Sequence, residues 1–312
     1  MRVKVDHLTK HAEEIGDRIA VIDDKAGQPV REFNYVVFNE QVNALANGFL
    51  ALGASEGSHI AWWGNNSVEV LLTIHAIRKS GGVSIPIPYR STREEANYLL
   101  GVADVEILVI ENRYVSVIEG LREELPNLKH IITFGMDKEK SVEKTMGEIL
   151  GPVSTPSSEG NFASTHNMIF TSGTTGNPKG AVRKVGGEAN QYGPLLQLLG
   201  WDRMDSLIFL TTGPLYHSGP SGFALRSQLV GATVVTQYAF DPVDWLRLVS
   251  THNVSATFSA PTPIRRITSL PNDVKDMYDV SSLRSLIANA APWTMNLKRA
   301  YLRDFREDSL WE

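Results

Sequence analysis

Ten consecutive residues near the middle of the chain combine hydroxyl side chains, glycines and a lysine: Thr171-Ser172-Gly173-Thr174-Thr175-Gly176-Asn177-Pro178-Lys179-Gly180. Glycine lets the backbone approach a ligand closely and permits positive φ, so successive N–H groups can converge on phosphate oxygens. The Ser and Thr hydroxyls add short donors, and Lys179 adds a compact positive charge. The segment therefore predicts a site for a polyanion. The alternative interpretation is a polar linker rich in Gly and Thr.

A Walker-type phosphate loop does not fit this segment. That pattern requires Gly before the Lys and Ser or Thr after it, whereas Pro178 precedes Lys179 and Gly180 follows it. The sequence therefore argues against a P-loop NTPase. The apolar run at residues 168–170 is typical of a buried strand, so we expect the loop to leave the end of that strand.

The segment resembles the phosphate loop of the AMP-forming acyl-CoA synthetases. These enzymes belong to the adenylate-forming superfamily, which also contains firefly luciferase and the adenylation domains of peptide synthetases. Other segments extend the resemblance over essentially the whole chain: 49–53, 64–67, 75–82, the proline–aromatic–histidine segment 214–219, and 287–292. The last of these is similar to the family's adenine-binding loop, which is usually richer in Ser and Gly.

The resemblance implies a role for residues in three of these segments. The triphosphate of ATP would be held by Ser172, Gly173, Thr174, Thr175, Gly176 and Lys179, and adenine by Ala290, Ala291 and Pro292. Thr171 would help to coordinate Mg²⁺, and His217 would line the acyl pocket, so Lys179 and His217 are the candidate catalytic residues. By sequence alone, a single His after an aromatic residue is more often a packed or surface residue, and residues 290–292 could equally be a plain turn.

The implied reaction is the activation of a carboxylic acid, with fatty or related acids as the expected class. The carboxylate would attack the α-phosphate of ATP, pyrophosphate would leave, and the thiolate of coenzyme A would then displace AMP. Donors aimed at the departing phosphates are the electrostatic device that such a step requires. The alternatives are an adenylation domain that loads a carrier protein, and a nucleotide-binding fragment without turnover.

The resemblance also implies that the chain is the N-terminal part of a longer enzyme. In the family, a Tyr-Gly-x-Thr-Glu segment would follow residues 311–312, and a small C-terminal domain with a catalytic Lys would come later. Neither is present in the sequence. We therefore expect a chain that is not fully active alone.

Composition narrows the function classes further. The chain has 312 residues, a net charge of −5 and no cysteine, which excludes disulfides and a cysteine nucleophile. Lys and Arg are scattered along the chain, so no nucleic-acid partner is expected. There is no secretory signal at the start and no apolar stretch of roughly twenty residues, so we expect no transmembrane segment and a cytoplasmic location. No pattern indicates an oligomeric state.

Strand-like and helix-like patterns alternate along the chain, which predicts an α/β fold with a mainly parallel sheet covered by helices. Strands are expected at 19–22, 60–63, 83–86, 105–110, 130–133, 206–210, 232–235 and 256–259, and helices at 35–52, 68–79, 93–100, 221–229, 242–251 and 294–305. The resemblance implies two mainly parallel sheets in the large N-terminal domain of the superfamily. A connector at 151–165 separates a first subdomain, residues 1–164, from a second, residues 165–312, which carries the loop.

Overall fold

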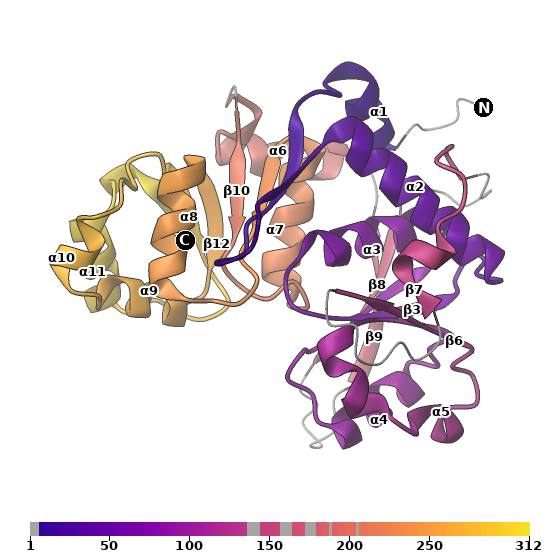
Figure 1. The fold of residues 1–312 in the computed structure, drawn as a ribbon. Helices are drawn as coiled ribbons and strands as arrows, with labels where there is room; N and C mark the ends of the chain where they lie inside the picture. The colour runs from indigo at the N-terminus through magenta and orange to yellow at the C-terminus, as the bar shows by residue number, and fades with distance from the viewer. Residues whose placement is uncertain (1–5, 136–143, 157–163, 172–178, 187–188, 204–205) are drawn as a thin grey trace. The chain divides into compact units, whose positions relative to one another are not determined.

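The chain forms two compact α/β units, each built around one β-sheet. The computed structural model describes residues 6–135, 144–156, 164–171, 179–186, 189–203 and 206–312. The first unit comprises Met1–Lys10, Val37–Asn65 and Glu69–Glu188, and the second comprises His11–Val36, Asn66–Val68 and Ala189–Glu312. Figure 1 shows both units and their elements. The fold class predicted from the sequence is confirmed.

The sheet of the first unit has the strand order β7-β6-β5-β3-β4-β8-β9 among the described residues. All neighbouring strands are parallel except β8 and β9, which form an antiparallel pair. The strands are β3 (His59–Trp63), β4 (Val83–Ile87), β5 (Ile107–Glu111), β6 (His130–Phe134), β7 (Lys144–Thr145), β8 (Ser164–Thr171) and β9 (Lys179–Gly186). The main helices of this unit are α2 (Tyr35–Ala51), α3 (Val68–Lys79), α4 (Arg93–Val102) and α5 (Leu121–Glu124).

Helices cover both faces of this sheet, as burial of its central strands requires. All five residues of β5 are buried. Figure 1 shows α2 and α3 on one side of the sheet and α4 and α5 on the other. Trp63 packs with α4 residues in one hydrophobic cluster, whereas the indole N–H of Trp62 donates to the Ser84 hydroxyl at 3.0 Å. Successive residues of a strand point to opposite faces, so the two tryptophans are core residues.

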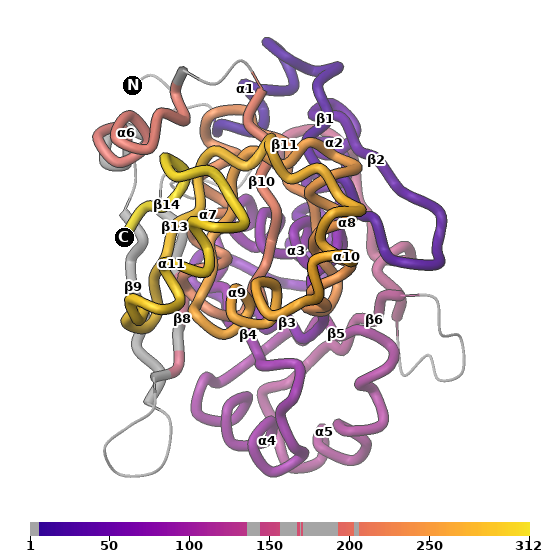
Figure 2. Tube along the Cα trace, turned by 90° about the vertical axis from the view of Figure 1, so that its left-hand side faces the viewer, coloured from indigo at the N-terminus to yellow at the C-terminus, as the bar shows by residue number. Residues whose placement is uncertain are grey.

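The sheet of the second unit has the order β14-β13-β12-β10-β11-β1-β2. Its strands are parallel except β2, which is antiparallel to β1. The strands are β1 (Ile19–Asp23), β2 (Arg31–Asn34), β10 (Ile208–Thr211), β11 (Thr233–Thr236), β12 (Ala256–Ser259), β13 (Ser285–Ala288) and β14 (Leu310–Trp311). Figure 2 shows β13 and β14 side by side at one edge of the sheet.

The helices of the second unit also lie on both faces of its sheet. They are α6 (Ala189–Leu198), α7 (Ser218–Leu229), α8 (Pro242–His252), α9 (Pro261–Thr268), α10 (Asn272–Lys275) and α11 (Met295–Asp304), and α1 (His7–Glu14) ends in this unit. Leu210 and Leu286 pack against residues of α8, α9 and α11. Phe258 instead stacks on Phe223 of α7, with ring centroids 5.2 Å apart. The sheet therefore lies between two helical layers.

The predicted division at residues 164/165 differs from these compact units. The prediction places strands β8 and β9 in the second subdomain, but β8 pairs with β4 and β9 pairs with β8, so both extend the first sheet. Strand β1, at the other end of the chain, pairs with β11 in the second sheet. The sequence pattern shows where strands occur, but pairing between distant strands decides which unit each strand joins.

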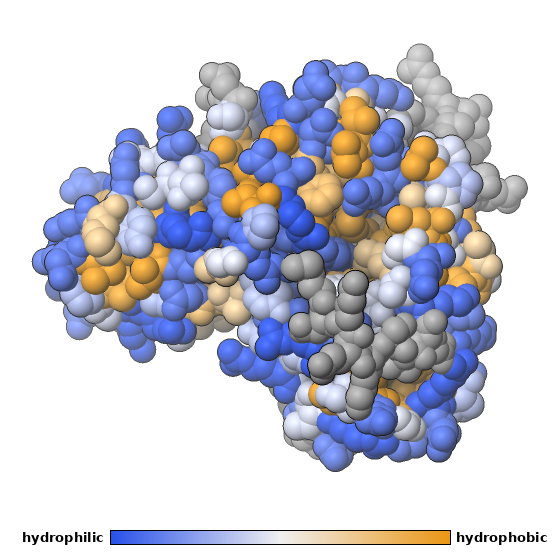
Figure 3. All heavy atoms as spheres, viewed as in Figure 1, coloured by the Kyte–Doolittle hydropathy of each residue, from blue (hydrophilic) through white to orange (hydrophobic). Residues whose placement is uncertain are grey.

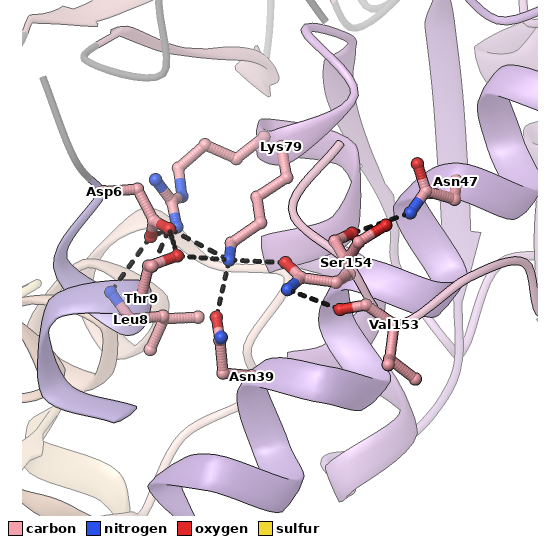
Figure 4. A network of polar contacts seen from close by, with 10 residues as sticks. Asp6, Leu8, Thr9, Asn39, Asn47, Lys79, Val153 and Ser154 are labelled. Atoms are coloured by element: carbon pink, nitrogen blue, oxygen red, sulfur yellow. Dashed lines mark hydrogen bonds and ion pairs between the residues drawn. The ribbon is translucent and has the colours of Figure 1, made fainter. Parts of the chain in front are cut away.

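A buried ionic network fixes the start of α1 in the first unit (Figure 4). The Asp6 carboxylate accepts hydrogen bonds from the backbone N–H groups of Leu8 and Thr9, which caps the helix. It also pairs with Arg78 at 2.8 Å and with the Lys79 ammonium at 2.9 Å. Burial opposes the charge on Asp6, but these two cations hold the pKa of Asp6 far below its ordinary value of 3.8.

The Lys79 ammonium has a set of oxygen partners in the same network. It donates to the side-chain oxygens of Asn39 at 2.6 Å and Asn43 at 2.7 Å, and to the Thr9 hydroxyl at 3.2 Å. Burial lowers the pKa of Lys79 to about 8, although Asp6 acts in the opposite direction. Asn43 and Asn47 then donate to backbone carbonyls of residues 152–154. The network thus also holds part of the predicted connector against α2.

The Asp6→Asn variant should unfold more easily than the wild type, but this difference in unfolding free energy should become smaller as the pH falls below about 4. Asn preserves a capping oxygen but cannot titrate. In the wild-type unfolded chain Asp6 binds a proton below its ordinary pKa of 3.8, whereas the folded chain keeps it charged. The stability that the carboxylate contributes is therefore present above this pH and is lost in acid. The difference in unfolding free energy should narrow by about 1.4 kcal/mol per pH unit.

Urea unfolding of both proteins at pH 7, 5, 4 and 3 measures this difference. The value at pH 5 is the baseline, because Asp6 is almost fully ionised there in both the folded and the unfolded wild type. Parallel stability curves down to pH 3 would contradict a depressed Asp6 pKa.

None of the described helices combines the length and the apolar composition that crossing a bilayer requires. The face seen in Figure 3 is mainly hydrophilic, with hydrophobic residues in separate groups.

Candidate functional site

The polyanion segment connects the two antiparallel strands β8 and β9. Their register runs from Ser164 opposite Gly186 to Thr171 opposite Lys179. Residues Ser172, Gly173, Thr174, Thr175 and Gly176 lie outside the described residues, and Thr171 and Lys179 are described through their backbone alone. The loop therefore begins at the end of a strand, as predicted, and its first residue and its lysine face each other across the base of a hairpin.

His217 lies in the second unit, on the segment that joins β10 to α7. It is the N-terminal flanking residue of α7, with extended backbone angles of φ −87° and ψ 140°. Its N–H donates to the Pro214 carbonyl at 3.1 Å, and its own carbonyl accepts from the Ser221 hydroxyl at 2.9 Å. His217 is only partly covered, since the residue remains accessible to solvent, and its imidazole lies against the Tyr216 ring, with centroids 4.3 Å apart. The turn and the helix start thus fix the backbone on both sides of the ring.

Desolvation by the surrounding protein lowers the pKa of His217 below its ordinary value of 6.5. At neutral pH the imidazole is therefore mainly uncharged. A neutral ring can donate or accept a hydrogen bond through its two nitrogens, and it presents an aromatic face to an apolar group. Both properties suit a wall of a binding site.

Residues 290–292 lie on an exposed loop after β13. Ala290 has a φ of 73°, which is uncommon for a residue with a side chain. Its N–H donates to the side-chain oxygen of Asn289 at 2.6 Å, and the N–H of Asn289 donates to the Ser259 carbonyl at 3.2 Å. The next residue, Trp293, is buried in the core of the unit. The loop is thus a specifically held strand-to-helix connection, as α11 begins at Met295.

His217 and residues 290–292 follow the carboxyl ends of strands in the same parallel sheet. Strands β10, β12 and β13 are successive neighbours in that sheet. Because parallel strands end at one edge, the segments after them gather there, which is where open α/β sheets bind ligands. Within the second unit the structure therefore brings the predicted acid-binding and adenine-binding segments to one edge. The predicted phosphate loop likewise follows the carboxyl end of a strand, β8, which is parallel to its neighbour β4 in the first unit.

Sequence reasoning missed a set of buried polar residues at this edge of the second unit. Asn66 binds the backbone of Gly213 and Leu215. The hydroxyls of Thr212 and Thr257 lie 2.7 Å apart, and the Trp245 indole N–H donates to Thr212 at 2.7 Å. These contacts join positions more than 30 residues apart, so no local spacing could reveal them. The one available signal was the polar segment 64–67 directly after the strand at 60–63.

The described residues contain no group of three or more His, Cys, Asp or Glu side chains arranged to hold a metal ion. Mg²⁺ commonly takes only one or two protein oxygens when phosphates supply further ligands. A threonine hydroxyl such as that of Thr171 is chemically suited to this limited role.

The chain belongs to the family of AMP-binding enzymes, which it matches over residues 8–312. Among curated proteins it is 27% identical over 269 residues to a feruloyl-CoA synthase of an Amycolatopsis species, covering 86% of this chain and 51% of that protein. It is 24% identical over 329 residues to a medium/long-chain-fatty-acid–CoA/3-oxocholest-4-en-26-oate–CoA ligase of Mycobacterium marinum, covering 96% and 58%. The chain thus spans about half the length of these relatives.

Solved structures confirm the fold. The inhibitor-bound N-terminal domain of FACL13 from Mycobacterium tuberculosis superposes with a TM-score of 0.80 and 21% identity, covering 96% of this chain and 73% of that one. The anthranilate CoA ligase AuaEII in complex with anthranoyl-AMP gives a TM-score of 0.82 and 19% identity, covering 99% and 60%. Together with the family match over residues 8–312 and the CoA-ligase relatives, this confirms the predicted resemblance to the adenylate-forming acyl-CoA ligases.

Proposed function

We propose that the protein activates a carboxylic acid by joining it to AMP, with fatty or related acids as the substrate class and coenzyme A as the final acceptor. The observation that carries this proposal is family membership over residues 8–312. The sequence between β8 and β9 supports it, because it contains the hydroxyls, glycines and lysine that suit phosphate oxygens.

The chemistry follows from charge movement. An oxygen of the acid attacks the α-phosphorus of ATP, the bond to the bridging oxygen breaks, and its electron pair leaves with pyrophosphate. Negative charge therefore grows on the β- and γ-phosphates. The loop from Ser172 to Gly176 supplies N–H and hydroxyl donors to these oxygens, and Lys179 supplies a positive charge. Thr171 would supply one oxygen to Mg²⁺, and the bound ion would add positive charge beside the phosphates.

The acid and the adenine are assigned to the second unit. His217 forms one wall of the acid site, and residues 290–292 contact the adenine through their backbone. The sulfur of coenzyme A then attacks the acyl carbon, and AMP leaves with the electron pair of the acyl–phosphate bond. The relatives' names cover aromatic, fatty and steroid acids, so a panel of acids is needed to identify the substrate.

Calorimetry with ATP and Mg²⁺ on the 312-residue chain is the first test, and heat of binding is expected. Carboxylate-dependent exchange of labelled pyrophosphate into ATP is the second, measured across straight-chain, aromatic and steroid acids. Exchange that requires a straight-chain or related acid supports the proposal. ATP binding without exchange for any acid would instead show that this chain binds nucleotide but does not activate an acid on its own, and the absence of ATP binding would overturn the proposal entirely.

A further inference from the structure

Asn66 is buried in the second unit and uses both ends of its carboxamide on one short backbone segment. The side-chain nitrogen donates to the Gly213 carbonyl at 3.0 Å, and the side-chain oxygen accepts the Leu215 N–H at 2.8 Å. The nitrogen also lies 3.4 Å from the Thr211 hydroxyl. Only 5% of Asn66 is exposed. A donor and an acceptor on opposite sides of the amide also determine its orientation.

The two bonded groups flank Pro214, which has no N–H of its own. The Pro214 carbonyl is in turn the acceptor for the His217 N–H at 3.1 Å. A single side chain therefore holds the backbone on both sides of the residue that forms the His217 turn. Breaking either Asn66 bond would leave a buried peptide group without that partner, which typically costs more than the bond itself contributes.

The rest of the segment is held by close packing. The Leu215 side chain is buried. A Cβ at Gly213 would lie 2.7 Å from Cγ of Pro220, and a Cβ at Gly219 would lie 2.5 Å from the Phe258 ring. Both distances are too short for a real carbon contact, so the start of α7 sits directly on its neighbours. The segment between Asn66 and α7 thus has little freedom while the Asn66 bonds are intact.

We infer that Asn66 is a positioning residue for the acid site: it fixes the conformation of residues 213–217 and thereby the placement of the His217 imidazole, which sets the preference among acids. This inference rests on the proposed role of His217. Asn66 acts through the backbone and touches neither acid nor nucleotide.

The Asn66→Ala variant tests the inference, with Asn65→Ala as a matched control. Asn65 is the neighbouring residue, is also buried, and accepts a hydrogen bond from the Tyr114 hydroxyl in the first unit. In Asn66→Ala the ratio of kcat/KM between two acids that differ by several methylenes should change by about tenfold, with the KM for ATP within about twofold. In Asn65→Ala that ratio should stay at the wild-type value.

A second measurement does not depend on activity. The His217 ring can be titrated by NMR on ¹⁵N-histidine-labelled protein, with its signals assigned through a His217→Gln variant. Freeing the segment should raise the pKa of His217 towards its ordinary value, because the surrounding protein desolvates the ring in the wild type. Asn66→Ala should show this rise and Asn65→Ala should not.

Asn66→Asp is a conservative variant in which low pH should restore the wild-type acid preference. A protonated carboxyl can donate to the Gly213 carbonyl and accept from Leu215, as the amide does, whereas the ionised carboxylate turns an oxygen towards that carbonyl. Burial raises the pKa of the introduced carboxyl above the unfolded value. The acid preference of Asn66→Asp, taken relative to wild type at each pH, should therefore match wild type at low pH and depart from it as the pH rises.

The outcomes separate this inference from the proposed function. Exchange activity that is absent in the wild type for every acid would defeat the proposed function, and the His217 titration alone would then decide whether Asn66 positions the ring. An unchanged His217 pKa in a folded Asn66 variant would overturn the inference, as would equal changes in Asn65→Ala. If Asn66→Ala does not fold, the same comparison applies to Asn66→Asp.

Discussion

Replacing Lys79 by methionine is expected to lower the free energy of unfolding by about 3–5 kcal/mol, the usual effect of removing one partner from a buried ion pair. The Lys79 side chain is completely buried, and its ammonium lies 2.9 Å from the Asp6 carboxylate. Methionine preserves most of the apolar stem but leaves Asp6 with Arg78 as its charged partner. It also removes the donor to the side-chain oxygens of Asn39 and Asn43.

Lys129→Met is the matched control for this prediction. The Lys129 ammonium lies 3.0 Å from the Glu106 carboxylate in the same unit, but its side chain is 59% exposed. Because water screens exposed pairs, this substitution should cost less than about 1 kcal/mol. Urea unfolding at pH 7, followed by circular dichroism, gives both values. Similar losses for the two variants would contradict the view that the buried network stabilises the first unit.

The consequence of the network extends beyond stability. Asn43 uses its oxygen for Lys79 and its nitrogen for the Val153 carbonyl. Asn47, one turn further along α2, donates to the carbonyls of Pro152 and Ser154. Residues 152–154 are therefore held by α2, the same helix whose Asn39 and Asn43 bind the Lys79 ammonium. Through this helix, the buried network also holds residues 152–154 of the predicted connector.

Local patterns predicted the elements well because the periodicity of apolar residues reflects which face is buried. The helix expected at 35–52 is α2, and Gly53 after it has a φ of 94°, as a helix end often requires. The helix expected at 93–100 is α4, and Thr92 and Glu95 form a capping box at its charged start. Strand β2 was missed because residues 31–34 are largely polar and at the edge of the sheet, where burial leaves little pattern.

Long-range contacts were beyond such reasoning. Arg78 and Asp6 are 72 residues apart, and Asn66 lies 145 residues from Thr211. A sequence can identify each side chain as polar, but only the fold shows that it is buried and paired. The candidate site shows the same difference between residues that sequence motifs identify and contacts that only the fold reveals. The loop, His217 and residues 290–292 were predicted from motifs, whereas the contacts by which Asn66 holds the His217 segment are visible only in the structure.

Removal of the Lys179 ammonium should have the largest effect on the proposed chemistry. In Lys179→Ala, carboxylate-dependent pyrophosphate exchange is expected to fall by about 10²–10³-fold, the usual loss when one donor to a developing negative charge is removed. Lys179 stands opposite Thr171 at the base of the hairpin, so its backbone is fixed by strand pairing. Lys179→Arg keeps the charge and should retain part of the activity, although guanidinium geometry differs from that of an ammonium.

Two further variants separate the roles of the residues. Lys184 lies on the same strand but pairs with His166, away from the loop. The Lys184→Ala variant should therefore exchange pyrophosphate at close to the wild-type rate. His217→Ala should change the preference among acids while the KM for ATP stays within about twofold, because its segment belongs to the proposed acid site. If Lys179→Ala and His217→Ala altered ATP use and acid preference equally, phosphate binding and acid binding could not be divided between the two residues. The proposed roles require two different defects. Lys179→Ala should impair the use of ATP, because it removes a charge from the loop, whereas His217→Ala should alter the preference among acids, because it changes a wall of the acid site.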